Sequence, residues 1–202
     1  KSGGGYSSGA HPGVHPFVLT NFSGTVQEVS TLVHEIGHMV HATQVIRSQP
    51  PIDADYMPFM AEIASTTAEI LFHDRMAAAA ATPRERAYYL EQHLNNLALM
   101  LYSATLGAEF ELRLYERVEA GEPVTAAEMD ALWLELNREY YSPAMNVDEL
   151  EAHGWAGFLH WYLDYYMFSY ATSFAAAEQF AARIAGEGEP AARATGIAGA
   201  QS

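Results

Sequence analysis

The sequence predicts a mainly α-helical domain with one short β element. Three observations point to this class. Capping signals stand before long apolar-periodic runs, proline and glycine fall between those runs, and a single short stretch is rich in β-forming residues. The chain has 202 residues, half of them hydrophobic, so it is long enough to bury a substantial core.

The first elements can be placed from these local signals. A glycine-rich loop occupies residues 1–24 and contains the one credible edge strand or hairpin arm, residues 16–22. Thr25 followed by Glu28 is a capping box, which opens a helix that continues to about Arg47. Two consecutive prolines then end this helix.

The later elements are also predicted to be helical. Pro58 suits a first helical position, and Thr82 and Thr125 are each followed three residues later by a glutamate. A helix is therefore expected over residues 25–47, 58–80, 82–120, 125–140 and 155–185. Residues 25–185 would form one helical domain, and residues 186–202 a flexible tail.

Composition excludes several classes of function. A formal net charge of −15 would repel nucleic-acid phosphates, and no apolar run reaches the roughly 18 residues that a membrane span needs. The absence of cysteine excludes disulfides and thiolate metal ligands, and the start has no signal-peptide pattern. We therefore expect a cytoplasmic protein that binds neither nucleic acid nor membrane.

The stretch HEIGHMVH, which starts at residue 34, carries the clearest functional signal. On a helix, His34 and His38 lie one turn apart on one face, so both imidazoles can bind one metal ion. Glu35 is rotated by about 100° from His34, which suits a base beside a metal-bound water. Because zinc acidifies such a water and the glutamate takes its proton, the pattern predicts peptide hydrolysis.

A zinc site of this kind needs a third protein ligand. Metzincins take it from a histidine ten residues after the first, but that position is Gln44, so the metzincin solution is excluded. A glutamate from the next helix is the other standard solution, and Glu62 and Glu69 lie two turns apart on one face. One could bind the metal while the other accepts a hydrogen bond from a ligand imidazole, and spacing does not separate these roles.

Three other interpretations of these residues fit less well. His41 lies two turns after His34, too far along the helix for the same ion, and is expected to line the pocket. A di-iron bundle needs two E-x-x-H motifs, and only residues 35–38 provide one. A structural bundle with incidental histidines would leave the capped, apolar setting of the motif unexplained.

The last predicted helix is dense in aromatic residues, most of which are expected to be core. His160, Tyr166 and Tyr170 are the exceptions. Tyrosine hydroxyls aimed at a metal site can donate hydrogen bonds to the oxyanion of a tetrahedral intermediate. The alternative is that the tyrosines form a polar rim on the helix.

Four ordered motifs resemble a known family. They are HEIGHMVH, the stretch FMAEIASTTAE at residues 59–69, the aromatic run at residues 155–172, and KSGGGYS with the FVLTNF strand at residues 17–22. Together they resemble the M3 zinc peptidases, and within them the oligoendopeptidase F branch, over about residues 1–180. The resemblance implies a zincin-like helical catalytic domain that holds one zinc ion.

The resemblance also implies a role for each residue of the metal motif. The zinc ligands would be His34, His38 and Glu62. Glu35 would be the general base and acid, and Glu69 would hydrogen-bond a ligand imidazole.

The remaining candidates would contact the substrate. His160, Tyr166 and Tyr170 are implied to contact the substrate carbonyl or the transition state. A glycine-rich loop can approach a peptide backbone closely because glycine has no side chain, and the strand after it could pair with an extended peptide. The further substrate-binding candidates are Gly4, Gly5, Tyr6 and His41.

The sequence thus predicts a zinc-dependent endopeptidase that hydrolyses short peptides. The alternative, from another class, is a zinc-binding helical core that binds peptides or partners without cleaving them. Family members are longer, with segments before the glycine-rich loop and after the tail. We therefore expect that family segments of this kind, which the 202 residues do not include, pack with this chain.

Overall fold

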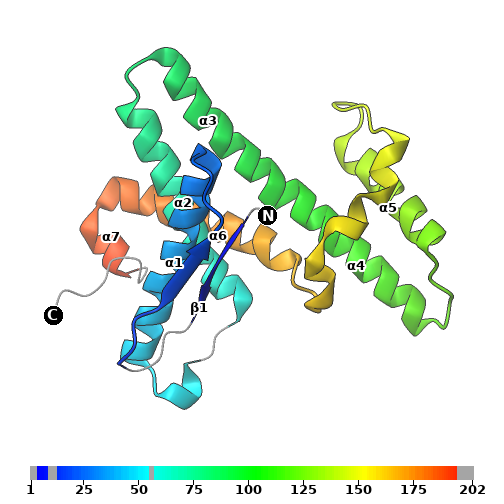
Figure 1. The fold of residues 1–202 in the computed structure, drawn as a ribbon, viewed down its shortest axis with the longest axis horizontal. Coiled ribbons are helices and arrows are strands. Elements are labelled where there is room, and N and C mark those ends of the chain that lie inside the picture. Colours follow the sequence, from blue (N-terminus) through cyan, green and yellow to red (C-terminus); the bar gives the residue numbers. More distant parts are fainter. Residues whose placement is uncertain (1–3, 9–12, 55–56, 195–202) are drawn as a thin grey trace. The chain divides into compact units, whose positions relative to one another are not determined.

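The computed structural model describes residues 4–8, 13–54 and 57–194 and confirms the mainly α-helical class. The chain divides into two compact units (Figure 1). The first comprises Lys1–Asn96 and Thr172–Ser202, and the second comprises Leu97–Ala171. The boundaries predicted at residues 24 and 185 stay predictions. Within the described ranges, no helix is both long and apolar enough to cross a membrane.

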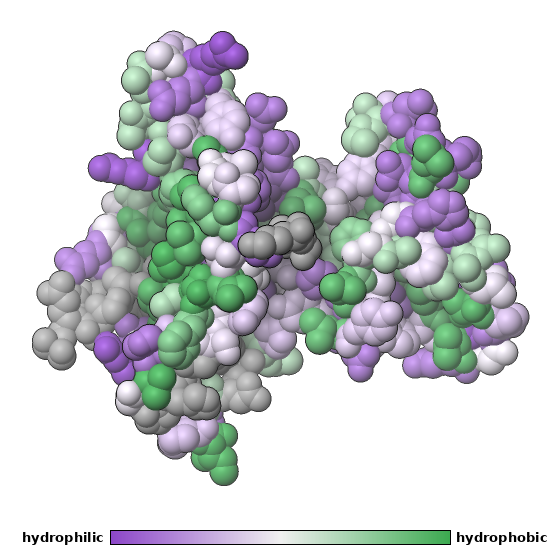
Figure 2. Space-filling view, in the orientation of Figure 1, coloured by the Kyte–Doolittle hydropathy of each residue, from purple (hydrophilic) through white to green (hydrophobic). Residues whose placement is uncertain are grey.

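A two-stranded antiparallel sheet forms the β part of the first unit, as predicted. Strand β1 (Gly5–Ser8) pairs with β2 (Phe17–Thr20), and Tyr6 lies opposite Leu19. Both strands contact helix α1. Exposed apolar side chains gather over the hairpin and α1 on the face that Figure 2 shows.

Three helices follow the hairpin in the first unit: α1 (Val26–Ser48), α2 (Pro58–Ala79) and α3 (Pro83–Leu97). The capping box of α1 is formed as predicted. The Glu28 N–H donates to the Thr25 hydroxyl at 3.3 Å, and the Thr25 N–H donates to the Glu28 carboxylate at 3.2 Å. These bonds satisfy N–H groups that a helix start leaves unpaired, which fixes where α1 begins.

The end of the chain completes the first unit. Helix α6 (Phe168–Glu187) belongs to it from Thr172 onward, and the Ser173 hydroxyl donates to the Phe59 carbonyl on α2 at 2.7 Å. A short helix, α7 (Glu189–Ala194), lies within the segment predicted as a flexible tail.

The second unit is built around a cluster of large apolar side chains. Phe110 and Leu136 are almost fully buried, and the Phe110 and Trp133 rings meet edge to face at 5.1 Å. The cluster joins two helices and two 3-10 segments: α4 (Ala104–Glu119), α5 (Ala126–Tyr141), Glu149–Gly157 and Leu159–Tyr162. A π-helical segment, Ala98–Ser103, precedes α4.

The prediction of a helix at residues 155–185 is wrong for the first part of that range. The chain makes 3-10 turns there, and α6 begins only at Phe168. Trp155 and Trp161 pack against Phe110, with ring centroids 6.4 and 5.5 Å away, and the Trp161 indole N–H donates to the Trp155 carbonyl at 2.7 Å. Burial of these large rings outweighs local helix propensity.

Candidate metal centre

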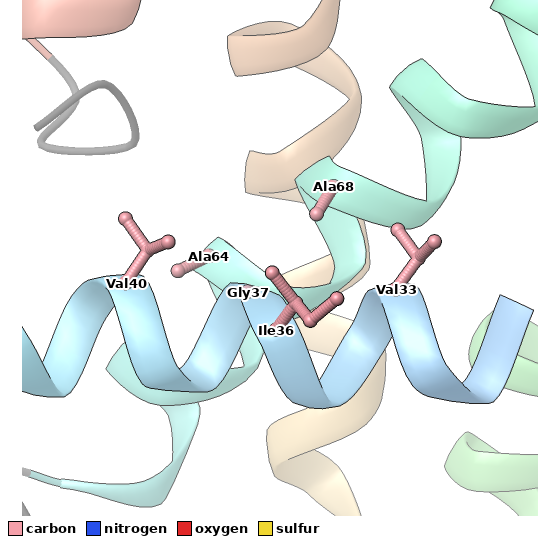
Figure 3. A pocket seen from close by; sticks show the side chains of 6 residues that line it. All are labelled: Val33, Ile36, Gly37, Val40, Ala64 and Ala68. Atoms are coloured by element: carbon pink, nitrogen blue, oxygen red, sulfur yellow. The ribbon is translucent and has the colours of Figure 1, made fainter. Parts of the chain in front are cut away.

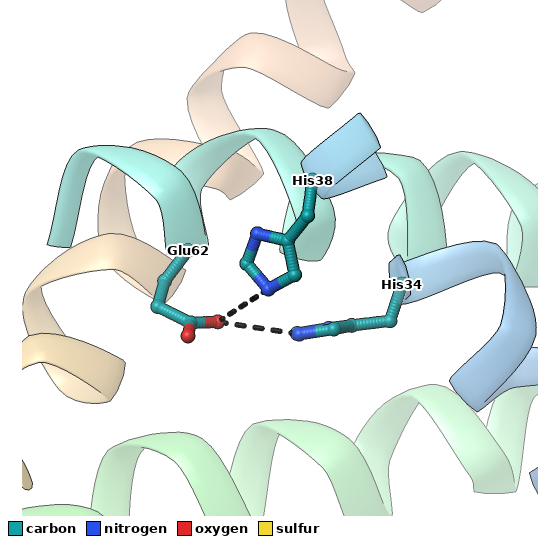
Figure 4. Close-up of side chains that lie close together, drawn as sticks. All are labelled: His34, His38 and Glu62. Atoms are coloured by element: carbon teal, nitrogen blue, oxygen red, sulfur yellow. Dashed lines mark ion pairs between the residues drawn. The ribbon is translucent and has the colours of Figure 1, made fainter. Parts of the chain in front are cut away.

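Side chains from α1 and α2 converge to form a candidate metal site. His34, His38 and Glu62 each offer one ligand atom, and these atoms lie within 4.8 Å of one another (Figure 4). The Glu62 carboxylate is 3.3 Å from His34 Nε2 and 3.8 Å from His38 Nε2. Ligand atoms held about 2.0 Å from a tetrahedral ion lie about 3.3 Å apart, so these residues fit a zinc ion. Among the described residues, no second group of this kind occurs.

The two histidines differ in their electrostatics when no metal is bound. Burial alone would lower the pKa of His34, but its hydrogen bonds to Glu62 and Glu69 outweigh burial and raise the pKa to about 10. Burial, reinforced by the charge of His34, lowers the pKa of His38 to about 4. Without a metal, the protonated His34 ring thus pairs with two carboxylates, which would also attract a divalent cation.

Glu69 lies on the far side of His34 from Glu62. Its carboxylate is 3.1 Å from His34 Nδ1, and its side chain is buried. With Nδ1 donating its proton to Glu69, His34 would bind a metal through Nε2, which faces Glu62, once the ion displaces the Nε2 proton. The two glutamates that the sequence left equivalent therefore have different contacts.

Glu35 is buried, at 6% exposed. Burial raises the pKa of its carboxyl group, while the charge of His34 and a hydrogen bond to Ser7 oppose this shift. A Cβ added to Gly5 would lie 3.2 Å from the Glu35 side chain, so β1 passes close over Glu35. The hairpin therefore shields the carboxyl group that the motif predicts as the base.

Gly37 allows α1 to cross α2 at very short distance. A Cβ added there would lie 2.5 Å from the Ser65 Cα and 3.0 Å from the Ala64 carbonyl oxygen. This contact sets the distance across which side chains of α1 reach Glu62. Beside the crossing is an apolar hollow of about 220 Å³ (Figure 3). Its lining residues are Val33, Ile36, Gly37, Val40, Ala64 and Ala68.

The other candidates in the first unit lie outside the metal group. His41 is partly buried on α1, and burial lowers its pKa. Gly4 has a φ of 112°, which favours glycine, and Tyr6 on β1 is 58% exposed. Gly5 lies close to the Glu35 side chain, as described above. Residues 1–3 of the predicted substrate loop lie outside the described residues.

His160, Tyr166 and Tyr170 form a cluster of their own. The His160 and Tyr166 rings stack with centroids 5.8 Å apart, and the Tyr170 hydroxyl is 3.2 Å from His160 Nε2. Tyr170 lies in α6, whereas the other two precede it. The three residues that the sequence grouped by helical spacing are therefore together without sharing a helix.

Sequence reasoning missed two buried residues next to Glu69. Ser30 hydrogen-bonds Glu69, and His73 hydrogen-bonds Ser30. A usable signal was present, because Ser30 precedes His34 by four positions and His73 follows Glu69 by four. Residues at that spacing share a helix face.

Comparisons with known proteins identify the family of this chain. Peptidase family M3 matches residues 1–201. Oligopeptidase PepF of Bacillus subtilis is 35% identical over 95% of this chain and 28% of its own length. An oligoendopeptidase F homolog of Lactococcus lactis is 34% identical over 91% of this chain and 30% of its own length. The crystal structure of oligoendopeptidase-F from Enterococcus faecium superposes with a TM-score of 0.65 at 33% identity, covering 83% of this chain and 30% of that one. This chain thus spans less than a third of the length of each of these three relatives.

Proposed function

This chain belongs to peptidase family M3, and we propose from this membership that it is the catalytic part of a zinc-dependent endopeptidase acting on short peptides. The observation that carries the proposal is the convergence of His34, His38 and Glu62 beside the buried Glu35. The names of the relatives support a peptidase, and the donor set of two imidazoles and one carboxylate suits zinc. A cytoplasmic location stays a prediction from the sequence.

The proposed mechanism assigns each residue a separate task. His34, His38 and Glu62 would hold the zinc ion, which when bound would supply Lewis-acid activation of water and of the scissile carbonyl. Glu35 accepts a proton from the attacking water and later gives a proton to the leaving amine. Glu69 keeps the His34 ring oriented through its hydrogen bond to Nδ1.

Substrate contacts are proposed for the hairpin and for the aromatic cluster. The β1–β2 hairpin, with Gly4, Gly5 and Tyr6, would bind an extended peptide by backbone hydrogen bonds beside Glu35. His41 would line the pocket. The aromatic cluster of the second unit would donate hydrogen bonds to the substrate carbonyl or its oxyanion.

Removal and return of the metal tests the proposal. The chain as purified is expected to contain one zinc ion and to cleave a short quenched fluorescent peptide. Treatment with a chelator should abolish cleavage, and stoichiometric zinc should restore it. Zinc content is measured by elemental analysis and cleavage by fluorescence. A folded chain that binds no zinc would contradict the proposal.

A second candidate function belongs to another class. It is the non-catalytic core that the sequence left as the alternative, which would bind zinc and peptide without cleaving the peptide. Zinc binding together with peptide binding, but without cleavage, would favour this non-catalytic core. Fluorescence anisotropy of the labelled peptide separates the two functions.

Replacement of the two glutamates, one at a time, tests the third ligand. Glu62→Ala removes a proposed ligand atom and is expected to weaken zinc binding more than Glu69→Ala, which would cost about 10- to 100-fold by freeing the His34 ring. Zinc dissociation constants from competition with a chromophoric chelator provide the measurement. If Glu69→Ala loses the metal while Glu62→Ala keeps it, the proposed ligand assignment is wrong.

A further inference from the structure

A buried polar chain extends from the metal centre to two residues that the proposed mechanism does not use. The Ser30 hydroxyl oxygen lies 2.9 Å from Glu69 Oε1 and 2.9 Å from His73 Nε2. Ser30, Glu69 and His73 are only 1%, 5% and 4% exposed. Buried polar groups are costly unless they are hydrogen-bonded, so these hydrogen bonds are a structural part of the interface between α1 and α2.

Helix periodicity explains how the four residues meet. Ser30 and His34 lie one turn apart on α1, and Glu69 and His73 lie one turn apart on α2. Their contacts alternate between the two helices, since Ser30 touches both residues of α2 while His34 touches Glu69. The crossing of α1 and α2 therefore brings Glu62 to the histidines, and one turn away along α1 the same two helices are joined by these hydrogen bonds.

Counting protons sets the direction of each hydrogen bond. The Ser30 hydroxyl has one proton and donates it to Glu69, so the His73 Nε2–H must be the donor toward the Ser30 oxygen. Glu69 then accepts from Ser30 on Oε1 and from His34 Nδ1 on Oε2. With both oxygens held, the carboxylate cannot turn without losing one of these bonds.

We propose that Ser30 and His73 are positioning residues for the metal centre, which hold Glu69 in the orientation that keeps His34 Nε2 directed at the ion. This inference rests on the proposed function. If Glu69 could rotate, His34 could take the tautomer that carries its proton on Nε2, and Nε2 could then not bind the metal. Ser30 and His73 touch neither metal nor substrate, so their effect acts through Glu69.

Zinc affinity of the 202-residue chain, measured by chelator competition, tests the proposal. Ser30→Ala is expected to weaken zinc binding by about 10-fold, the lower end of the effect of outer hydrogen-bond partners of metal ligands. Thr67→Val is the matched control. Its hydroxyl is as deeply buried but donates at 2.6 Å only to the Ile63 carbonyl of its own helix, so zinc affinity should not change.

His73 supplies an independent pair of variants, which also serves if Ser30→Ala does not fold. His73→Leu should weaken zinc binding, whereas His73→Gln should restore it because its amide can donate to the Ser30 oxygen. In a double-mutant cycle with Glu69→Ala, Ser30→Ala should cause little further loss, because the side chain that connects Ser30 to His34 is already absent.

The outcomes separate this inference from the proposed function. Zinc binding by the wild type with unchanged affinity in Ser30→Ala or His73→Leu would overturn the positioning role alone. Equal losses in Ser30→Ala and Thr67→Val would assign the effect to packing and also overturn it. A wild-type chain that binds no zinc would overturn the proposed function itself.

Discussion

Glu35→Gln is expected to leave zinc bound and to lower the rate of peptide cleavage by about 10³-fold, within the range that removal of a general base produces. Glutamine has almost the same shape as glutamate but cannot accept a proton at pH 7. Glu35 is not among the three converging ligand residues, so the metal site should survive. Cleavage of a fluorescent peptide and zinc content are measured on the same preparation.

The surroundings of Glu35 explain why its loss should not be compensated. The carboxyl group is 6% exposed and lies beneath β1, where Gly5 leaves room for it. Bulk water therefore has little access to the position of the Glu35 carboxylate, so it should not take over the role of the base. Glu91→Gln, which changes an exposed glutamate on α3, controls for the loss of one negative charge. Cleavage by Glu35→Gln at the wild-type rate would exclude Glu35 as the base.

The metal motif was predictable because it depends on one helix. Spacing alone placed His34 and His38 on a common face, and capping signals alone located the start of α1. Glu62 and Glu69 could not be separated in this way, since both lie on the same face of α2. Their contacts differ only because of where α1 crosses α2, with Glu62 near both Nε2 atoms and Glu69 at His34 Nδ1.

The helix prediction for the aromatic region failed for a related reason. Residues 155–167 carry an apolar pattern that local rules read as helix, but tertiary packing decides their backbone. The Glu111 carboxylate accepts the Tyr165 N–H at 2.8 Å, and Tyr165 adopts a φ of 53°, which no helix contains. Burial of Trp155 and Trp161 around Phe110 adds to this local constraint. Such long-range contacts leave no periodic signature in the sequence.

Gly37→Ala is expected to lower the free energy of unfolding by about 2–3 kcal/mol, as overpacking does, and to weaken zinc binding strongly. Helix propensity alone predicts the opposite sign, since alanine favours a helix interior over glycine by about 1 kcal/mol. The added methyl group would lie 2.5 Å from the Ser65 Cα, and backbone cannot move aside as a flexible side chain can. The helices must therefore separate, and Glu62 on α2 moves away from the two histidines on α1.

Gly186→Ala provides the matched control, because Gly186 also lies in a helix but an added Cβ would meet nothing within 4 Å. That variant should keep or slightly raise stability and should bind zinc as the wild type does. Denaturant unfolding of the metal-free proteins gives the stability difference, and chelator competition gives the zinc affinity. If Gly37→Ala instead matched Gly186→Ala in both measurements, the close crossing of α1 and α2 would not be what aligns the ligands. Loss of zinc in Gly37→Ala, but not in Gly186→Ala, would show that the site requires the absence of a side chain at Gly37 as well as the two histidines of the motif.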